Sequence, residues 1–189
     1  MDELTLFIKI SLAVIFISSG LSKIRSIESH HFLVESYEIV PKNLVKLFSY
    51  LNIFIELFTG ALLFLGLYHI LSTVLTLILL SLYIVAISTN LLRGRKTISC
   101  GCGGVLGNHQ LSLNLVIRNI ILFLVTFVLF FHKPVLGSIQ ALFQGFQVST
   151  IYNLNYFVIL LFANAFLVTS LIASNLLKIK LRINSLFTN

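Results

Sequence analysis

The stretch LVKLFSYLNIFIELFTGALLFLGLYHILSTVLTLILLSLYIVAISTNLL, residues Leu44–Leu92, decides the fold. It contains two long apolar runs, Leu44–Gly66 and Ile70–Leu92, joined by a tight connection at Gly66–His69. A helix of about 20 residues crosses the roughly 30 Å hydrocarbon core of a bilayer. Neither run shows the alternating pattern of a barrel strand, so the stretch predicts two consecutive transmembrane helices.

Three further apolar runs extend this pattern over most of the chain. They cover Leu4–Gly20, Leu111–Phe131 and Tyr156–Leu177. Hydrophobic residues make up 58% of the 189 residues and charged residues only 10%, which is too few to cover a water-soluble domain. The sequence therefore predicts an all-α integral membrane protein, a bundle of about five transmembrane helices with a four-helix core and a C-terminal helix.

The domain organisation follows from the same runs. Residues 1–189 are predicted to form a single transmembrane domain, in which residues 1–131 hold the four-helix region. Residues 132–189 add an extramembrane connection, the fifth helix and a basic tail. Asp2 and Glu3 lead the chain, whereas the n-region of a secretory signal is basic, so we expect the first helix to be retained.

The excess of basic residues predicts how the helices are oriented. The chain has 13 Lys and Arg against 6 Asp and Glu, a net charge of +7. In a membrane protein this charge reports topology, and it gives no reason to expect a nucleic-acid partner. With five spans, one side of the bilayer holds Lys23, Arg25, Lys42, Lys46, Arg93, Arg95, Lys96, Lys178, Lys180 and Arg182. The other side holds Lys133, so the positive-inside rule predicts an external N-terminus and a cytoplasmic loop after the third helix.

That loop, RGRKTISCGCGG at Arg93–Gly104, contains the only two cysteines of the chain, Cys100 and Cys102. Only thiolates attack disulfides or bind soft metals. Three basic residues lie upstream and are expected to favour the thiolate electrostatically. They are Arg93, Arg95 and Lys96.

The glycines and the spacing of the pair point to redox chemistry. Gly101, Gly103 and Gly104 accept positive φ, which a tight turn requires. A Cys-x-Cys disulfide closes a smaller ring than the usual geometry favours, so strain makes it easier to reduce. The pair therefore suits transfer of oxidising equivalents better than structural stapling.

Two other interpretations of the cysteines stay open. They can be incidental small residues in a glycine turn, or they can belong to a soft-metal site for Cu(I) or Zn. Two thiolates rarely complete a zinc site, and only His109 lies nearby as a third ligand, so no metal site is predicted. All five histidines fall in loops or at helix ends and are expected to be interfacial or solvated. They are His30, His31, His69, His109 and His132.

Ionisable and polar residues also lie inside the predicted spans. Asn52, Glu56 and Gly60 are spaced at i, i+4 and i+8 and share one helix face, where the glycine allows another helix to approach closely. Arg118 lies roughly 10 Å deep in the fourth helix and is expected to meet Glu56, directly or through Asn52 or a water. Lys9 is expected to snorkel or to face a partner. The Glu56–Arg118 pair is either a structural ion pair or part of a polar pocket for a proton relay or a quinone headgroup.

Several short motifs give the chain a resemblance to a known family. SSGLSKIR ends the first helix, YEIVP follows at Tyr37–Pro41, and ELFTG lies at Glu56–Gly60. LLRGRKTISCGCGG leads to LSLNLVIRN at Leu111–Asn119. In this order the motifs resemble the MauE branch of the MauE/DoxX-like redox-associated membrane proteins, over about residues 4–131.

The resemblance implies redox maturation of partner proteins, such as disulfide formation in methylamine dehydrogenase beside a thioredoxin-like partner. It implies that Cys100 and Cys102 are the redox pair, and related DoxD-like proteins imply a quinone as electron acceptor. Gly103 departs from the family pattern, in which an aromatic residue follows the second cysteine. Disulfide formation in an exported partner also favours external thiols, in conflict with the basic-residue count.

The sequence thus predicts a multi-pass protein of a bacterial cytoplasmic membrane that exchanges disulfides with a thioredoxin-like or cysteine-containing partner. Catalysis is expected at Cys100 and Cys102. A non-catalytic membrane scaffold or immunity-type protein is the alternative, and a copper-binding membrane protein is a second one.

Overall fold

The computed structural model describes residues 2–95, 97–101, 110–132 and 135–187, and this part of the chain is helical apart from short connections. Helices follow from the apolar runs, because a backbone inside a bilayer must satisfy its hydrogen bonds within its own segment. The elements are α1 (Asp2–Arg25), α2 (Ile27–Ser36), the 3₁₀ turn η1 (Lys42–Leu44), α3 (Val45–Leu65), α4 (His69–Leu92), α5 (Leu113–Phe131), α6 (Ile139–Phe143), α7 (Val148–Ile151) and α8 (Leu154–Phe187).

Five helical segments of the described residues are long and apolar enough to cross a membrane, as the sequence predicted. They are Asp2–Arg25, Lys42–Leu65, His69–Leu92, Leu113–Phe131 and Val148–Ala173. Large apolar side chains such as Phe54, Leu82, Ile117 and Phe162 are exposed on the outer faces of these helices. In water such faces would be unfavourable, so the exposed apolar surface fits a lipid environment, and the all-α membrane fold is confirmed.

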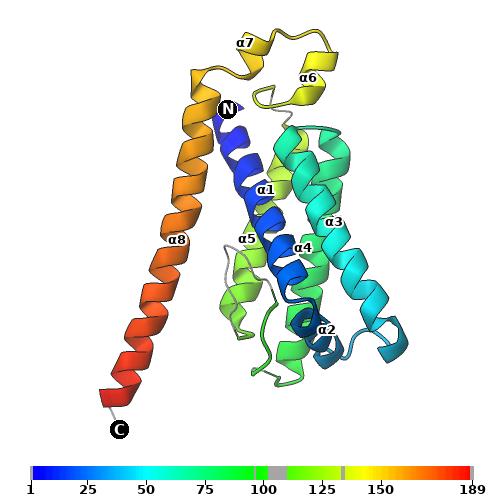
Figure 1. The fold of residues 1–189 in the computed structure, drawn as a ribbon, viewed down its shortest axis with the longest axis vertical. Coiled ribbons are helices and arrows are strands. Elements are labelled where there is room, and N and C mark those ends of the chain that lie inside the picture. The colour runs from blue at the N-terminus through cyan, green and yellow to red at the C-terminus, as the bar shows by residue number, and fades with distance from the viewer. Residues whose placement is uncertain (1, 96, 102–109, 133–134, 188–189) are drawn as a thin grey trace.

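Helix α1 lies at the centre of the bundle and packs against α3, α5 and α8, while α4 pairs with α5 (Figure 1). Small residues bring α1 and α3 close together. A Cβ atom built on Gly60 would lie 2.7 Å from Ile17 Cγ1, and one on Gly20 would lie 2.7 Å from Leu57 Cδ2. The close approach predicted at Gly60 is therefore confirmed, and a second glycine supports it from the opposite helix.

The two ends of the bundle carry short elements that the sequence did not predict. Figure 1 shows α2 at the end where α1 finishes, and α6 and α7 at the opposite end. At that opposite end Lys9 Nζ donates a hydrogen bond to the Gly137 carbonyl at 2.8 Å, and Ser138 Oγ donates to the Gly66 carbonyl at 2.8 Å. Lys9 thus faces a partner, one of the two expectations for it, and ties α1 to the connection after α5.

Helix α8 is the C-terminal helix predicted outside the four-helix core. Its first half packs on α1 through a cluster of Leu6, Ile10, Tyr156 and Ala163. Figure 1 shows it along the outside of the bundle, farther from the other helices toward its C-terminal end. The four helices α1, α3, α4 and α5 therefore build the interior in which the polar residues lie.

Candidate functional site

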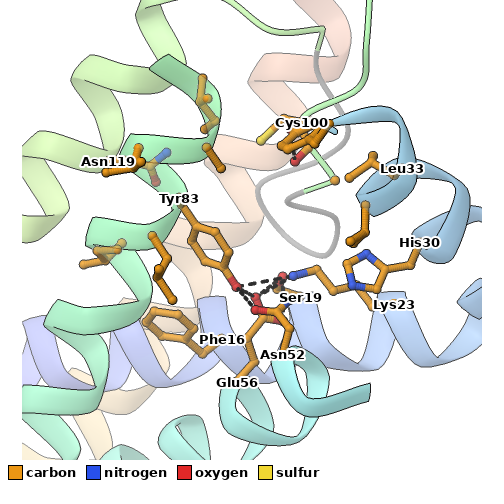
Figure 2. Close-up of a pocket in the computed structure, with 18 of the residues that line it drawn as sticks. Phe16, Ser19, Lys23, His30, Leu33, Asn52, Glu56, Tyr83, Cys100 and Asn119 are labelled. Atoms are coloured by element: carbon orange, nitrogen blue, oxygen red, sulfur yellow. Dashed lines mark hydrogen bonds and ion pairs between the residues drawn. The ribbon is translucent and has the colours of Figure 1, made fainter. Parts of the chain in front are cut away.

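A buried charged cluster lies where α1, α3 and α4 meet (Figure 2). The Glu56 carboxylate is fully buried, and Lys23 Nζ lies 2.6 Å from its Oε1 atom with a side chain that is only 6% exposed. The Tyr83 hydroxyl donates a hydrogen bond to the same oxygen, and Ser19 Oγ donates to the carboxylate at 3.4 Å. Asn52 Oδ1 accepts a hydrogen bond from Tyr83 at 3.2 Å. These contacts satisfy a carboxylate that would otherwise be costly in an apolar bundle.

Helical spacing explains how the cluster forms. Ser19 and Lys23 are four residues apart on α1, and Asn52 and Glu56 are four apart on α3, so each pair projects from one helix face. The close contact between α1 and α3 then brings the two faces together. Tyr83 approaches from α4 and completes the cluster.

The direct ion-pair partner of Glu56 is not the predicted Arg118. Glu56 forms its salt bridge with Lys23, which the sequence had placed in a basic loop, and it forms none with Arg118. The reason is that α1 continues to Arg25, beyond the apolar run that ended at Gly20, so Lys23 is carried into the bundle. Arg118 does reach the same interior, but its Nε and Nη2 atoms are buried without a hydrogen-bond partner among the described residues.

A cavity of about 210 Å³ connects the charged cluster to the cysteine loop. Most of its wall is apolar, with side chains such as Phe16, Leu80 and Leu122. Polar groups are concentrated at a few positions. They are Ser19, Lys23, His30, Tyr37, Asn52, Glu56, Tyr83, Arg118 and Asn119. Cys100 and Gly101 line the same space, so one cavity is lined both by a cysteine and by the buried ion pair.

Within the described part of the chain, three cavity residues have buried polar atoms without hydrogen-bond partners. These atoms are His30 Nε2, Asn119 Nδ2 and the Nε and Nη2 of Arg118. The side chains of Asn119 and His30 are only 3% and 7% exposed, and buried polar groups are ordinarily hydrogen-bonded. The cavity therefore contains more hydrogen-bonding capacity than the described residues use.

His30 is buried, in contrast to the expectation that the histidines are interfacial or solvated. It projects from α2 into the cavity, and its pKa is lowered from 6.5 to about 4. Burial is the largest cause, followed by the charges of Lys23 and His31. The imidazole is therefore neutral at physiological pH.

Cys100 is buried in an apolar cluster and takes part in a disulfide. The Tyr37 hydroxyl donates hydrogen bonds to the carbonyls of Ser99 and Cys100, at 3.2 and 3.1 Å. Burial raises the pKa of Tyr37, which keeps the hydroxyl protonated as a donor. Gly101 has φ +65°, as predicted for a tight turn. The predicted site residues Cys102, Gly103 and Lys96 lie outside the described residues.

Arg93 and Arg95 hold the end of α2. Arg93 Nη1 donates to the Tyr37 carbonyl at 3.4 Å, and Arg95 Nη1 donates to the Ser36 carbonyl at 3.2 Å. Arg95 also forms a salt bridge with Glu38, which lowers the pKa of that carboxyl. The sequence assigned these arginines to thiolate stabilisation, whereas their observed contacts fasten the cysteine loop to the C-terminal end of α2.

Sequence reasoning missed Lys23, His30, Tyr37, Tyr83 and Asn119. Two of them had a usable signal, since Lys23 lies four residues after Ser19 and Tyr37 opens the YEIVP motif. Among the described residues, no group of three or more His, Cys, Asp or Glu side chains is placed to hold a metal ion. His109, the third ligand considered for a soft metal, lies outside that part of the chain.

Comparison with known proteins identifies the family. No solved structure matches the chain. A relative from Paracoccus denitrificans, described as methylamine utilization protein MauE, is 28% identical over 115 residues, which are 61% of this chain and 62% of the relative. The chain thus spans less than two thirds of the length of that relative. The family model described as methylamine utilisation protein MauE matches residues 1–132, more than half of the chain, and the chain therefore belongs to the MauE family of membrane proteins.

Proposed function

We propose that this protein is a membrane-embedded thiol–disulfide redox protein that uses Cys100 and Cys102 to exchange disulfides with a thioredoxin-like or cysteine-containing partner during maturation of that partner. The observation that carries the proposal is the shared cavity, which Cys100 lines together with Lys23, Glu56 and Tyr83. An inert loop would have no need of a buried polar cluster beside its cysteine. A redox pair needs such groups, because oxidation of a dithiol releases two electrons and two protons.

A quinone is the electron acceptor that fits this cavity best. Its apolar wall suits a flat ring that arrives through the bilayer. The donors of Asn119 and Arg118, which have no partner among the described residues, suit carbonyl oxygens. A quinone accepts two electrons and two protons to become a quinol. The chain's own contribution is to orient the ring with these donors, to exclude water with the apolar wall, and to hold exchangeable protons on Lys23 and Tyr83 beside the Glu56 carboxylate.

The name of the Paracoccus relative refers to methylamine utilisation, and we infer that this chain supports a partner in a related redox system. The substrate of that partner is not specified by any residue of the cavity. The cavity supports the proposal of a reaction class, the movement of a disulfide between a protein and the membrane interior.

The test is a double variant, Cys100→Ser with Cys102→Ser, compared with the wild type for the disulfide state of cysteine-containing proteins in the same cells. The proposal expects the partner to accumulate in its reduced form. Ser81→Ala, a change of one exposed hydroxyl on α4, serves as the control for membrane insertion. If the double variant supports full partner maturation, the redox function is wrong, and the alternative of a non-catalytic scaffold or immunity-type protein takes its place.

A further inference from the structure

Arg118 brings a positive charge to the wall of the cavity beside the charged cluster, and no acidic side chain compensates it. An arginine keeps its proton in a protein, and a charge in apolar surroundings is unfavourable unless an opposite charge lies beside it. Glu56, the one buried acidic residue, is bound to Lys23. The chain has five other acidic side chains, and all of them are described and exposed: Asp2, Glu3, Glu28, Glu35 and Glu38.

The charges on the cavity wall therefore do not balance. Lys23 and Arg118 are positive, Glu56 is negative, and the His30 imidazole is neutral at physiological pH. Two positive charges less one negative charge leave the wall with a net charge of +1. Water that enters the cavity can accept hydrogen bonds, but it supplies no opposite charge. An anion supplies both, so the wall favours a ligand with one negative charge.

The free donors have the geometry that an acid group requires. Nε and Nη2 of Arg118 lie on one edge of the guanidinium, and both are without a partner among the described residues. Their N–H groups can make two parallel hydrogen bonds to the two oxygens of a carboxylate or phosphate, whereas a single carbonyl oxygen matches this edge less well. Asn119 follows on α5 and lines the same cavity (Figure 2), and its buried Nδ2 atom is a third donor without a partner in that part of the chain.

The cavity also reaches the lipid-facing surface. Its wall includes Phe48 on α3 and Leu82 and Val85 on α4, which are exposed on the outer faces of these helices. An apolar chain can therefore extend from the buried donors to the bilayer between α3 and α4 without meeting water. The volume of about 210 Å³ is below the roughly 300–1,000 Å³ of most ligand sites, which favours one chain over the two chains of a phospholipid.

We propose that this cavity binds a long-chain carboxylate, with its acid group on Arg118 and Asn119 and its single apolar chain directed toward the bilayer. Such a ligand uses both donors of the arginine edge, balances the charge of the wall and covers its apolar side chains. The inference goes beyond the proposed function and depends on no redox activity. Because the proposed function places a quinone at the same two donors, the two ligands compete for them.

The experiment measures ligand binding to the full-length protein in micelles of a neutral detergent. Palmitate, hexadecanol and dioleoylphosphatidylglycerol are added separately at the same mole fraction, at a pH where palmitate is ionised, and the bound ligand is counted by native mass spectrometry. We expect the wild type to bind palmitate about tenfold more tightly than hexadecanol, and Arg118→Met to lose about tenfold in palmitate affinity, because hydrogen bonds to a charged group are lost. Arg25→Met, which removes an exposed arginine at the end of α1, is the matched control and should bind palmitate as the wild type does.

Equal affinity of the wild type for palmitate and hexadecanol would overturn the acid site, and this comparison does not depend on how a variant folds. Unchanged palmitate binding in Arg118→Met would overturn it as well. Binding of the phospholipid without binding of palmitate would overturn the assignment of a single chain. An excess of decylubiquinone should release bound palmitate. Palmitate that stays bound would support the acid site and contradict the placement of the quinone at Arg118 and Asn119, so the two proposals can fail separately.

Discussion

Lys23 and Glu56 show how one residue pair keeps a charge tolerable inside an apolar bundle. With the Nζ atom 2.6 Å from Oε1 and both side chains buried, each charge is compensated by the other and by the hydroxyls of Ser19 and Tyr83. The contribution of such a pair is clearest when it is broken, because one uncompensated charge stays behind.

We therefore predict that Lys23→Met lowers the free energy of unfolding by about 3–5 kcal/mol, and that adding Glu56→Gln recovers most of that loss. Unfolding in detergent micelles measures both values. Arg118→Met is the matched control, since Arg118 forms no salt bridge with Glu56, and its effect should add to that of Glu56→Gln. A compensating effect in the Arg118 cycle, and none in the Lys23 cycle, would show that the pairing is wrong.

A second prediction about single residues concerns the reduction potential of the cysteine pair. If Cys100 and Cys102 transfer oxidising equivalents, their disulfide should have a reduction potential above the roughly −300 mV of structural bridges. Equilibration of the purified protein in glutathione or thioredoxin buffers, followed by alkylation and mass measurement, gives the potential. A value below −300 mV would indicate a structural bridge.

At the scale of elements, α2 is the helix that positions the loop. Tyr37 at its end binds the loop carbonyls, while Arg93 and Arg95 bind back to the carbonyls of Ser36 and Tyr37. We predict that Tyr37→Phe speeds hydrogen–deuterium exchange in residues 97–101, because the loss of the hydroxyl leaves buried carbonyls unsatisfied at a cost of about 1–3 kcal/mol. Tyr50→Phe, at an exposed tyrosine, is the control and should leave that exchange unchanged.

His30, also on α2, makes the stability of the protein depend on pH. Its pKa is about 4 in the folded protein and 6.5 ordinarily, so between these values the unfolded chain binds more protons. Stability should therefore fall as the pH is lowered from about 6.5 to 4, and His30→Asn should flatten that slope. Thermal unfolding of the wild type and His30→Asn across this pH range tests this dependence of stability on pH, with His132→Asn as the control. An unchanged slope in His30→Asn would show that another group is responsible.

At the scale of the whole molecule, orientation in the membrane decides where partners are met. The loss of Lys23 to the bundle interior leaves the basic bias in place, and it still predicts a cytoplasmic cysteine loop. Two single-cysteine variants, Lys42→Cys and Tyr68→Cys, in a Cys100→Ser and Cys102→Ser background, report which side of the membrane each position faces. An impermeant thiol reagent should label Tyr68→Cys in intact cells and Lys42→Cys only after permeabilisation. The reverse pattern would place the loop outside, where an exported partner would meet it.

The sequence predicted the parts of the fold that depend on length and composition. The five spans follow from apolar runs, and the contact at Gly60 follows from its small size. It did not predict the partner of Glu56, because Lys23 follows the polar residue Ser22 and has the sequence context of a loop. The sequence did not predict the burial of His30 either, since α2 is short and carries charged residues. Only the packing of α2 over the end of the bundle removes the His30 side chain from water.

The central position of α1 has a consequence for biogenesis. This helix is synthesised before the groups that satisfy its lysines: Glu56 follows Lys23 by 33 residues, and Gly137 follows Lys9 by 128. At translation rates of about 5–20 residues per second, the nascent helix waits several seconds or more with two uncompensated ammonium groups. On its own, such a helix would partition unfavourably from the translocon into lipid. The pairing of α1 with α3 through Lys23 and Glu56 then compensates the first of these groups, whereas Lys9 has no such partner until Gly137 has been synthesised.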